Sequence, residues 1–185
     1  KLVMGDRETV INWKSDLKLK GDCFDLARSI LRFFNLPDLK AEIKFRTNIP
    51  RQAGMAGSTA LLSAILSVIL EAMSRDYSRY YFAELNRIIE LRYMKTQCGY
   101  QDAYMTTFGG LNFISFRNKE YYRELEEECY ASVEPLSVSE LPFIVAHTGI
   151  EHHSGQFHRP LRERWLEGEE EIREGYRKIT EIAIN

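Results

Sequence analysis

Between residues 41 and 73 the hydrophobic pattern changes from strict alternation to a nearly continuous apolar run. The alternation predicts a strand with one buried face, and Pro50 ends it because proline has no N–H to donate. The positions expected on the buried side are Ile43, Phe45, Thr47 and Ile49. The run from Ala60 to Leu70, interrupted only by two serines, predicts a buried helix with Ser58 and Thr59 as N-cap candidates.

Shorter patterns predict the other elements. Residues 1–13 indicate one or two short strands, and apolar positions at helical spacing predict a helix over residues 23–34, with Asp22 as its cap. The remaining expected elements are a long helix over Tyr77–Cys98 closed by Gly99, a strand over Leu111–Phe116, a central strand over Leu141–Ala146 and an amphipathic helix over Leu161–Ala183.

The loop between the central strand and helix, AGMAGST over residues 53–59, holds candidate chemistry. Gly54 and Gly57 allow positive φ and a close approach of a ligand to the backbone. A phosphate suits this place, because the first N–H groups of a helix have no internal partner and the helix dipole adds positive charge. An ordinary strand–loop–helix connection explains the same residues. Neither the Walker loop nor the dinucleotide fingerprint is present.

Composition excludes several classes of protein. The 185 residues allow one domain or one and a half, and 44% hydrophobic residues are enough for a core. A net charge of −2 and a pI near 6.2 give no field that would recruit nucleic acid or an acidic membrane. The apolar run after Thr59 is too short to span a bilayer. Three scattered cysteines, Cys23, Cys98 and Cys129, predict reduced thiols and a cytoplasmic location.

Residues 49–60, IPRQAGMAGSTA, resemble the ATP-binding motif P-x-x-x-G-L-G-S-S-A of the GHMP kinases. That superfamily contains galactokinase, homoserine kinase, mevalonate kinase and phosphomevalonate kinase. The chain departs from the pattern at Met55, Ala56 and Thr59, and these small changes keep the geometry of the loop. The resemblance implies that the ATP phosphates bind at Gly54, Met55, Ala56, Gly57, Ser58 and Thr59.

A second segment resembles the same family. CGYQDAY over residues 98–104, followed by a Gly-Gly pair before a strand, is similar to the C-G-x-x-D-Q-like segment of GHMP sugar kinases. The resemblance makes Asp102 the catalytic base, although the family often has Gln or Arg where this chain has Ala103. Glu90 alone is typical of a solvated helix charge. It lies twelve residues before Asp102, where the family has a glutamate that holds Mg²⁺, so the resemblance assigns Mg²⁺ to Ser58 and Glu90.

The C-terminal part resembles glucuronokinases in particular. SGQFH over residues 154–158 and RERWLEG over residues 162–168 are similar to their S-G-x-x-H and R-x-R-W-L-x-G segments, and IPRQ over residues 49–52 is similar to theirs. The resemblance covers about residues 40–183. The substrate contacts that it implies are Gln101, Tyr104, His158 and Arg162.

Four histidines, His147, His152, His153 and His158, cluster within twelve residues. Their H-x-x-x-x-H-H spacing is no standard zinc pattern. With Arg159, Arg162 and Arg164 they fit a polar sugar pocket, because arginine pairs bidentately with the carboxylate of a uronic acid. Solvated arginines at the start of a helix explain the same residues.

The resemblance implies an α+β GHMP kinase fold. Residues 1–138 would form an N-terminal ribosomal-protein-S5-domain-2-like ATP-binding domain, incomplete at its start, and residues 139–185 the truncated beginning of a ferredoxin-like C-terminal domain. We expect a fragment, because the chain begins without methionine and two family motifs, one N-terminal and one glycine-rich and C-terminal, are not in these residues.

The implied function is that of a cytoplasmic sugar kinase that uses ATP and Mg²⁺ and binds neither nucleic acid nor membrane. Its acceptor would be a sugar hydroxyl, the anomeric one of a uronic acid or a related sugar. Heptose phosphate, galactose and mevalonate are alternative acceptors. A non-catalytic nucleotide-binding or sugar-binding member of the fold is the alternative from another class.

Overall fold

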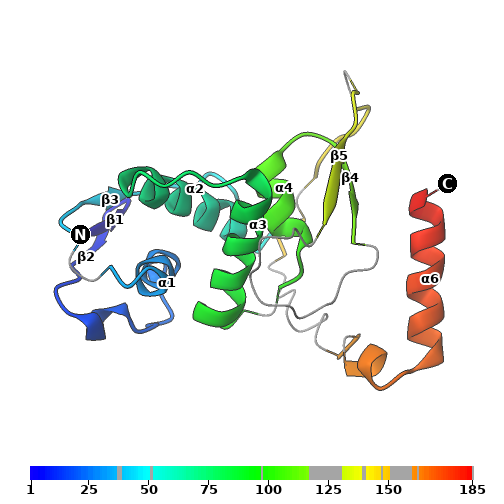
Figure 1. Ribbon diagram of the computed structural model, residues 1–185, viewed down its shortest axis with the longest axis horizontal. Coiled ribbons are helices and arrows are strands. Elements are labelled where there is room, and N and C mark those ends of the chain that lie inside the picture. Colours follow the sequence, from blue (N-terminus) through cyan, green and yellow to red (C-terminus); the bar gives the residue numbers. More distant parts are fainter. Residues whose placement is uncertain are drawn as a thin grey trace.

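The computed structural model describes residues 1–36, 39–50, 52–96, 98–116, 131–138, 141–146, 148–150, 160–161 and 163–184. Figure 1 shows a small sheet and a group of helices at one side, and a two-stranded ribbon and a C-terminal helix at the other. This mixture of helix and sheet confirms the α+β class. In the part of the chain described after residue 138 there are helices and no strand, so the ferredoxin-like domain remains a prediction.

The N-terminal sheet has the strand order β2-β1-β3. Strand β1 (Leu2–Met4) pairs antiparallel with β2 (Arg7–Thr9) and parallel with β3 (Ile43–Lys44). The two predicted N-terminal strands are therefore confirmed. The alternating strand predicted to continue to Ile49 is wrong beyond its first residues, because after the bond from Phe45 N to Val3 O, at 3.0 Å, the chain leaves the sheet edge.

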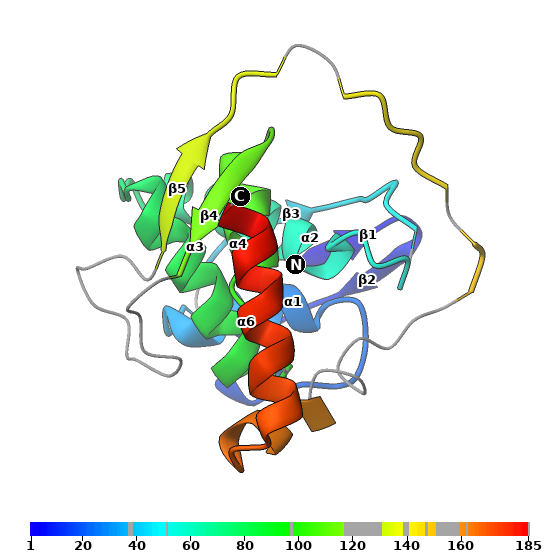
Figure 2. The same cartoon turned by 90° about the vertical axis from the view of Figure 1, so that its right-hand side faces the viewer.

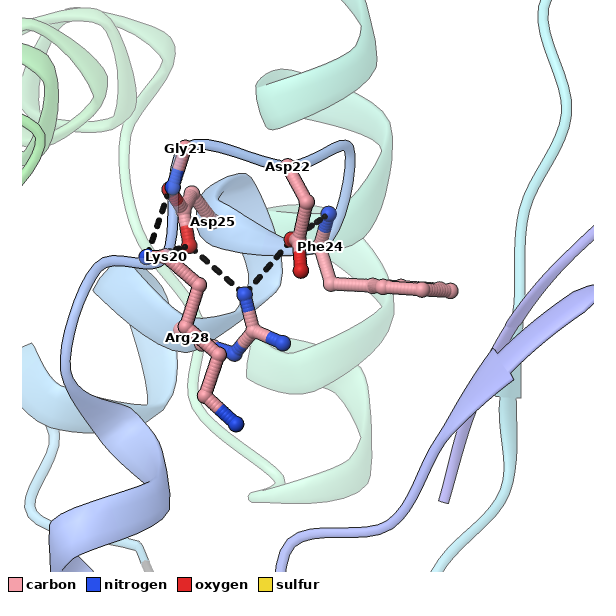
Figure 3. A network of polar contacts seen from close by, with 6 residues as sticks. All are labelled: Lys20, Gly21, Asp22, Phe24, Asp25 and Arg28. Atoms are coloured by element: carbon pink, nitrogen blue, oxygen red, sulfur yellow. Dashed lines mark hydrogen bonds and ion pairs between the residues drawn. The ribbon is translucent and has the colours of Figure 1, made fainter.

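Helix α1 (Asp25–Phe33) is held at its start by a buried arginine, Arg28, which is 1% exposed (Figure 3). Its Nη1 donates 2.6 Å bonds to Asp22 Oδ1 and to Asp25 Oδ1, and Asp22 also accepts the N–H of Phe24. Burial by itself would raise the pKa of Asp22, but these bonds more than offset burial and lower it. Asp22 thus stabilises the helix start as expected, although the N-cap position is Phe24.

Three helices form the framework of the domain: α2 (Gly57–Ala72), α3 (Arg79–Ile88) and α4 (Gln101–Phe108). Helix α2 is the predicted apolar helix, and its buried side chains pack against α1 and the sheet. Buried members of this core include Leu2, Ile30, Leu62, Leu66 and Ile69.

The long helix predicted over Tyr77–Cys98 is confirmed over residues 79–93 and wrong beyond them. Helix α3 ends at Ile88, a π-helical turn η2 (Ile89–Tyr93) follows, and Lys95 has a φ of +60° that stops further winding. Met94 N donates to Ile89 O, which is the i→i+5 bond of a π-helix. The chain then starts α4 at Gln101, in a segment for which the pattern predicted no helix.

A second, smaller core surrounds Tyr104 of α4 and Ala131. Beside it, β4 (Asn112–Ser115) pairs antiparallel with β5 (Ser132–Pro135), which confirms the strand predicted over Leu111–Phe116. This ribbon is separate from the N-terminal sheet. The aromatic rings of Tyr80, Tyr104 and Phe108 pack edge-on or stacked between the helices.

The C-terminal elements differ from the predictions. The expected strand over Leu141–Ala146 is wrong, because these residues pair with no strand and Ile144 is 96% exposed. The expected single C-terminal helix is interrupted at Gly168, where φ is +83°, and continues as α6 (Glu170–Ile184). Helix α6 lies nearest β4 in Figure 1 and faces the viewer in Figure 2.

Candidate active site

The turn before α2 places free backbone N–H groups at the helix start. Ala56 occupies the N-cap position in the left-handed conformation, with φ +50°, and no side chain in the described part of the chain caps the helix. The predicted capping by Ser58 or Thr59 is therefore wrong, because the helix already begins at Gly57. The first turn carries no acidic side chain. Unsatisfied N–H groups together with the helix dipole make this helix start an anion-binding position.

Gly57 packs closely against Ile49. A Cβ at this position would lie 3.0 Å from Ile49 Cγ2, so a larger residue would require Ile49 or the turn to shift. Gly54 has a φ of +70° and meets nothing within 4 Å of a built Cβ, so its role is conformational. The two predicted glycines thus shape the turn for different reasons. Met55 is exposed beside them.

A buried hydrogen bond joins α2 to the π-helical turn. Thr59 Oγ1 donates to Glu90 Oε1 at 2.9 Å, and Glu90 is only 2% exposed. Sequence reasoning paired Glu90 with Ser58, but Ser58 is exposed and Thr59 is the residue in contact. The extra residue of the π-helical turn sets the direction of Glu90, and no pattern in the sequence predicted that turn.

The environment of Glu90 favours its neutral form. Burial raises the pKa of Glu90 to about 7, the bond from Thr59 opposes this, and the negative charge of Asp102 raises the pKa further. Asp102 lies in the first turn of α4, on its exposed side. The negative charge of Asp102 acts on Glu90, so the two carboxyl groups lie within electrostatic range of each other. Sequence analysis predicted both residues for the site, and the structure places Glu90 in contact with Thr59.

Two further residues complete this cluster, and sequence reasoning missed both. Burial and the nearby negative charge of Glu90 raise the pKa of the Cys98 thiol to about 12, so the thiol stays protonated. Arg87 is buried, its guanidinium carbon lies 3.6 Å from the ring centroid of Tyr100, and its positive charge lowers the pKa of Glu90. The i,i+3 spacing of Arg87 and Glu90 was the available signal.

The predicted substrate contacts have different outcomes. Gln101 is exposed at the start of α4, next to Asp102. Tyr104 is fully buried, and its hydroxyl donates to Glu84 and accepts the N–H of Ala131 at 3.1 Å. Tyr104 therefore packs inside the domain, and the prediction that it contacts substrate is wrong for this structure. His158 and Arg162, like the other three clustered histidines, lie outside the described residues.

The donor set fits a hard divalent cation that arrives with a phosphate ligand. Glu90 offers a carboxylate and Thr59 a hydroxyl, and the charge of Asp102 is close enough to act on the same region. Mg²⁺ is commonly held by one or two carboxylates plus phosphate oxygens and water. Within the described part of the chain, no group of three or more His, Cys, Asp and Glu side chains is arranged to hold a metal ion.

Two more observations concern the helices and the cysteines. Over the described residues, no helix is long and apolar enough to cross a membrane. The described cysteines, Cys23 and Cys98, are not in disulfides, as predicted.

Comparisons with known proteins find similar sequences among kinases. The family model of the GHMP kinases N terminal domain matches residues 23–110, a range that includes the turn before α2, Glu90 and Asp102. Glucuronokinase 1 of Arabidopsis thaliana is 29% identical over 143 residues, which are 76% of this chain and 38% of that protein. Probable glucuronokinase 2 of the same plant is 30% identical over 150 residues, 80% of this chain and 40% of that protein.

A bacterial relative matches a shorter stretch. The D-glycero-alpha-D-manno-heptose 7-phosphate kinase of Campylobacter jejuni is 29% identical over 91 residues, which are 49% of this chain and 27% of that protein. The chain thus spans about two fifths of the length of the two plant relatives.

Proposed function

Because the chain belongs to the GHMP kinase family, we propose that its protein is an ATP-dependent sugar kinase. One observation carries the proposal. The buried hydrogen bond from Thr59 to Glu90 lies in the first turn of α2, next to the uncapped helix start, and the charge of the exposed Asp102 acts on the same glutamate. An anion site, a hard-cation ligand and a potential base are the parts that phosphoryl transfer requires.

The roles of the residues follow from their chemistry. The backbone N–H groups from Gly54 to Thr59 bind the phosphates of ATP and hold the γ-phosphoryl group at the start of α2. Mg²⁺ bound with ATP would neutralise charge on the β- and γ-phosphates, with Glu90 and the hydroxyl of Ser58 or Thr59 to hold it. The neighbouring Arg87 limits the rise in the pKa of Glu90, which helps that carboxyl group to ionise.

Asp102 is proposed as the general base. Its carboxylate accepts the proton of the acceptor hydroxyl as the hydroxyl oxygen attacks the γ-phosphorus. A bond forms between that oxygen and phosphorus, the bond from phosphorus to the leaving oxygen breaks, and ADP departs with the bonding electrons. Among the described residues, no hydrogen bond to another side chain occupies the Asp102 carboxylate, so it can face a substrate.

The acceptor is proposed to be a uronic acid or a related sugar, phosphorylated at its anomeric hydroxyl to give a sugar 1-phosphate. The names of the two plant relatives and the RERWLEG segment over residues 162–168 support this choice. The name of the Campylobacter relative supports a second candidate, a heptose phosphate acceptor.

The test measures ADP release with ATP, Mg²⁺ and each of glucuronate, galacturonate, galactose and heptose 7-phosphate. The expected result is release that depends on one acidic or phosphorylated sugar and is lost in Asp102→Asn. Asp6→Asn, in the exposed turn between β1 and β2, is the matched control and should retain full activity. Sugar-dependent release that persists in Asp102→Asn would remove this residue as the base. Nucleotide binding without any turnover would favour a non-catalytic member of the fold.

A further inference from the structure

A groove lies between side chains of α2, α3 and α4. Its volume is about 440 Å³, which falls in the size range of small-molecule sites, roughly 300–1,000 Å³. Neither Thr59, Glu90 nor Asp102 lines it. The residues that do are Ala60, Ser63, Ala64, Ser67, Tyr77, Arg79, Phe82, Thr106 and Thr107.

The serine and threonine hydroxyl groups of this lining have already used their hydrogens. Ser67 Oγ donates to Ala64 O at 2.9 Å, and Thr107 Oγ1 donates to Ala103 O at 2.7 Å. Thr106 Oγ1 donates to Asp102 O at 2.8 Å. A hydroxyl has one hydrogen and two lone pairs, so these oxygens can offer only lone pairs to the groove. A ligand that suits them must donate hydrogen bonds.

A chain of polar contacts lies beneath the groove. Because the Thr106 hydrogen points to a backbone carbonyl, Ser63 is the donor in the 3.0 Å contact between the two hydroxyls. Asn86 Nδ2 in turn donates to Ser63 Oγ. Asn86 is fully buried, and its Oδ1 has no hydrogen-bond partner among the described residues. Apolar side chains would pack these helices without the cost of an unsatisfied oxygen, so stability alone does not explain the polar floor.

One end of the groove is cationic. Arg79 is exposed in the first turn of α3, and none of the ion pairs or hydrogen bonds found among the described residues involves it. Tyr77 OH accepts a long bond of 3.4 Å from Arg75 Nη1, which leaves the Tyr77 hydrogen able to donate. A guanidinium group pairs bidentately with a carboxylate or a phosphate. This end of the groove therefore favours an anionic group.

The remaining wall is apolar. Ala60 and Ala64 lie one turn apart on α2 and Phe82 faces the same groove from α3. The C–H faces of a sugar ring pack well against such surfaces, while its hydroxyls donate to the surrounding oxygens. We propose that this groove binds a small polyhydroxylated anion, a sugar acid or a sugar phosphate, at a site distinct from the catalytic residues. The proposal does not depend on the chain being a kinase.

The test measures binding to the Asp102→Asn protein without ATP, so that no turnover consumes the ligand. The probes are glucuronate, glucose 1-phosphate, glucose and inorganic phosphate, each followed by titration calorimetry. Glucuronate and glucose 1-phosphate distinguish the two sources of the anionic group. The expected result is that at least one of them binds more tightly than glucose and than inorganic phosphate.

Two kinds of variant locate the binding. Ala64→Leu and Ser67→Leu fill the groove from exposed or rim positions, and each should remove the groove-bound equivalent of ligand. Arg79→Gln should weaken the acidic probe about tenfold or more and leave glucose unchanged, since it removes only the pairing charge. The controls are Val68→Leu, exposed on α2 outside the groove, and Lys44→Gln on β3; both should bind like the parent.

Three outcomes would overturn the proposal. The first is binding that survives both groove-filling variants, which would place the ligand at the catalytic residues. The second is inorganic phosphate that binds as tightly as glucose 1-phosphate, which would show that the hydroxyls are not recognised. The third is no binding of either acidic sugar by protein whose circular dichroism spectrum and melting transition are intact. ADP release is measured separately on the unsubstituted protein. A failure of the proposed kinase activity would therefore leave the binding results interpretable.

Discussion

Thr59 Oγ1 and Glu90 Oε1 are joined by a 2.9 Å hydrogen bond between the first turn of α2 and the π-helical turn that follows α3. This contact connects the anion-binding helix start to the carboxyl group with the most perturbed acidity among the described residues. It gives the first two predictions below, because both the protonation of Glu90 and the position of Thr59 depend on it.

Glu90→Gln is expected to change how stability depends on pH. The pKa of Glu90 is about 7 in the folded chain against an ordinary 4.5, so the folded state binds the proton more tightly. Its contribution to stability is therefore full below about pH 4.5 and is lost as the pH rises through about 7, a change of about 3 kcal/mol. Urea unfolding of both proteins without ATP or Mg²⁺ checks this. A difference between them that stays constant with pH would contradict it.

Thr59→Val is expected to lower the free energy of unfolding by about 1 kcal/mol, because it removes the bond to the buried Glu90. Ser58→Ala should change stability by less than about 0.5 kcal/mol, since Ser58 is exposed. Thr59→Ser keeps the hydroxyl and serves as the control. Chemical denaturation at neutral pH is the measurement. A larger loss in Ser58→Ala than in Thr59→Val would show that the sequence-based pairing of Ser58 with Glu90 is the correct one.

Gly57→Ala is expected to displace the turn that precedes α2. The added Cβ would lie 3.0 Å from Ile49 Cγ2, so the chain must shift, at a cost of about 1–3 kcal/mol. Binding of an ATP analogue should weaken as well, because the first N–H groups of α2 move with the turn. Gly175→Ala in α6 is the matched control. Its Cβ meets nothing within 4 Å, and alanine favours a helix by about 0.5–1 kcal/mol. Equal effects of the two substitutions would contradict the packing argument.

Tyr104→Phe is expected to destabilise the domain without changing the acceptor KM. The substitution removes the hydroxyl that bonds to Glu84 and to the N–H of Ala131, at a cost of about 1–2 kcal/mol. Thermal unfolding gives the stability change, and ADP release over a range of sugar concentrations gives KM. A rise in KM with unchanged stability would restore Tyr104 as a substrate contact.

Local patterns predicted much of the fold. The apolar run of α2, the helix α1, the N-terminal strands and β4 all appear where their periodicity placed them. Each of these elements buries a face made of residues that are close in sequence. The hydrophobic pattern along the chain therefore predicts them without information on distant contacts. The loop glycines were available for the same reason, from a short and continuous motif, whereas the roles of Glu90 and Asp102 came from the resemblance to the GHMP kinases.

Long-range packing decided the features that the sequence left out or gave wrongly. A π-helical turn forms in the second half of the predicted helix and turns Glu90 inward toward Thr59, thirty-one residues away. Tyr104 is polar and close to Asp102 in sequence, and it was predicted to contact substrate. It is buried instead, and Glu84 and Ala131 supply hydrogen-bond partners from distant segments.

By itself, the sequence determined which residues could carry chemistry and which segments are helical or extended, because those properties depend on neighbours along the chain. Only the tertiary structure decided which hydroxyl meets Glu90, which tyrosine is buried and where α2, α3 and α4 leave a groove. The physical reason is that desolvation and hydrogen-bond pairing depend on the groups that surround a side chain in space. Those groups come from elements whose relative placement no local pattern specifies.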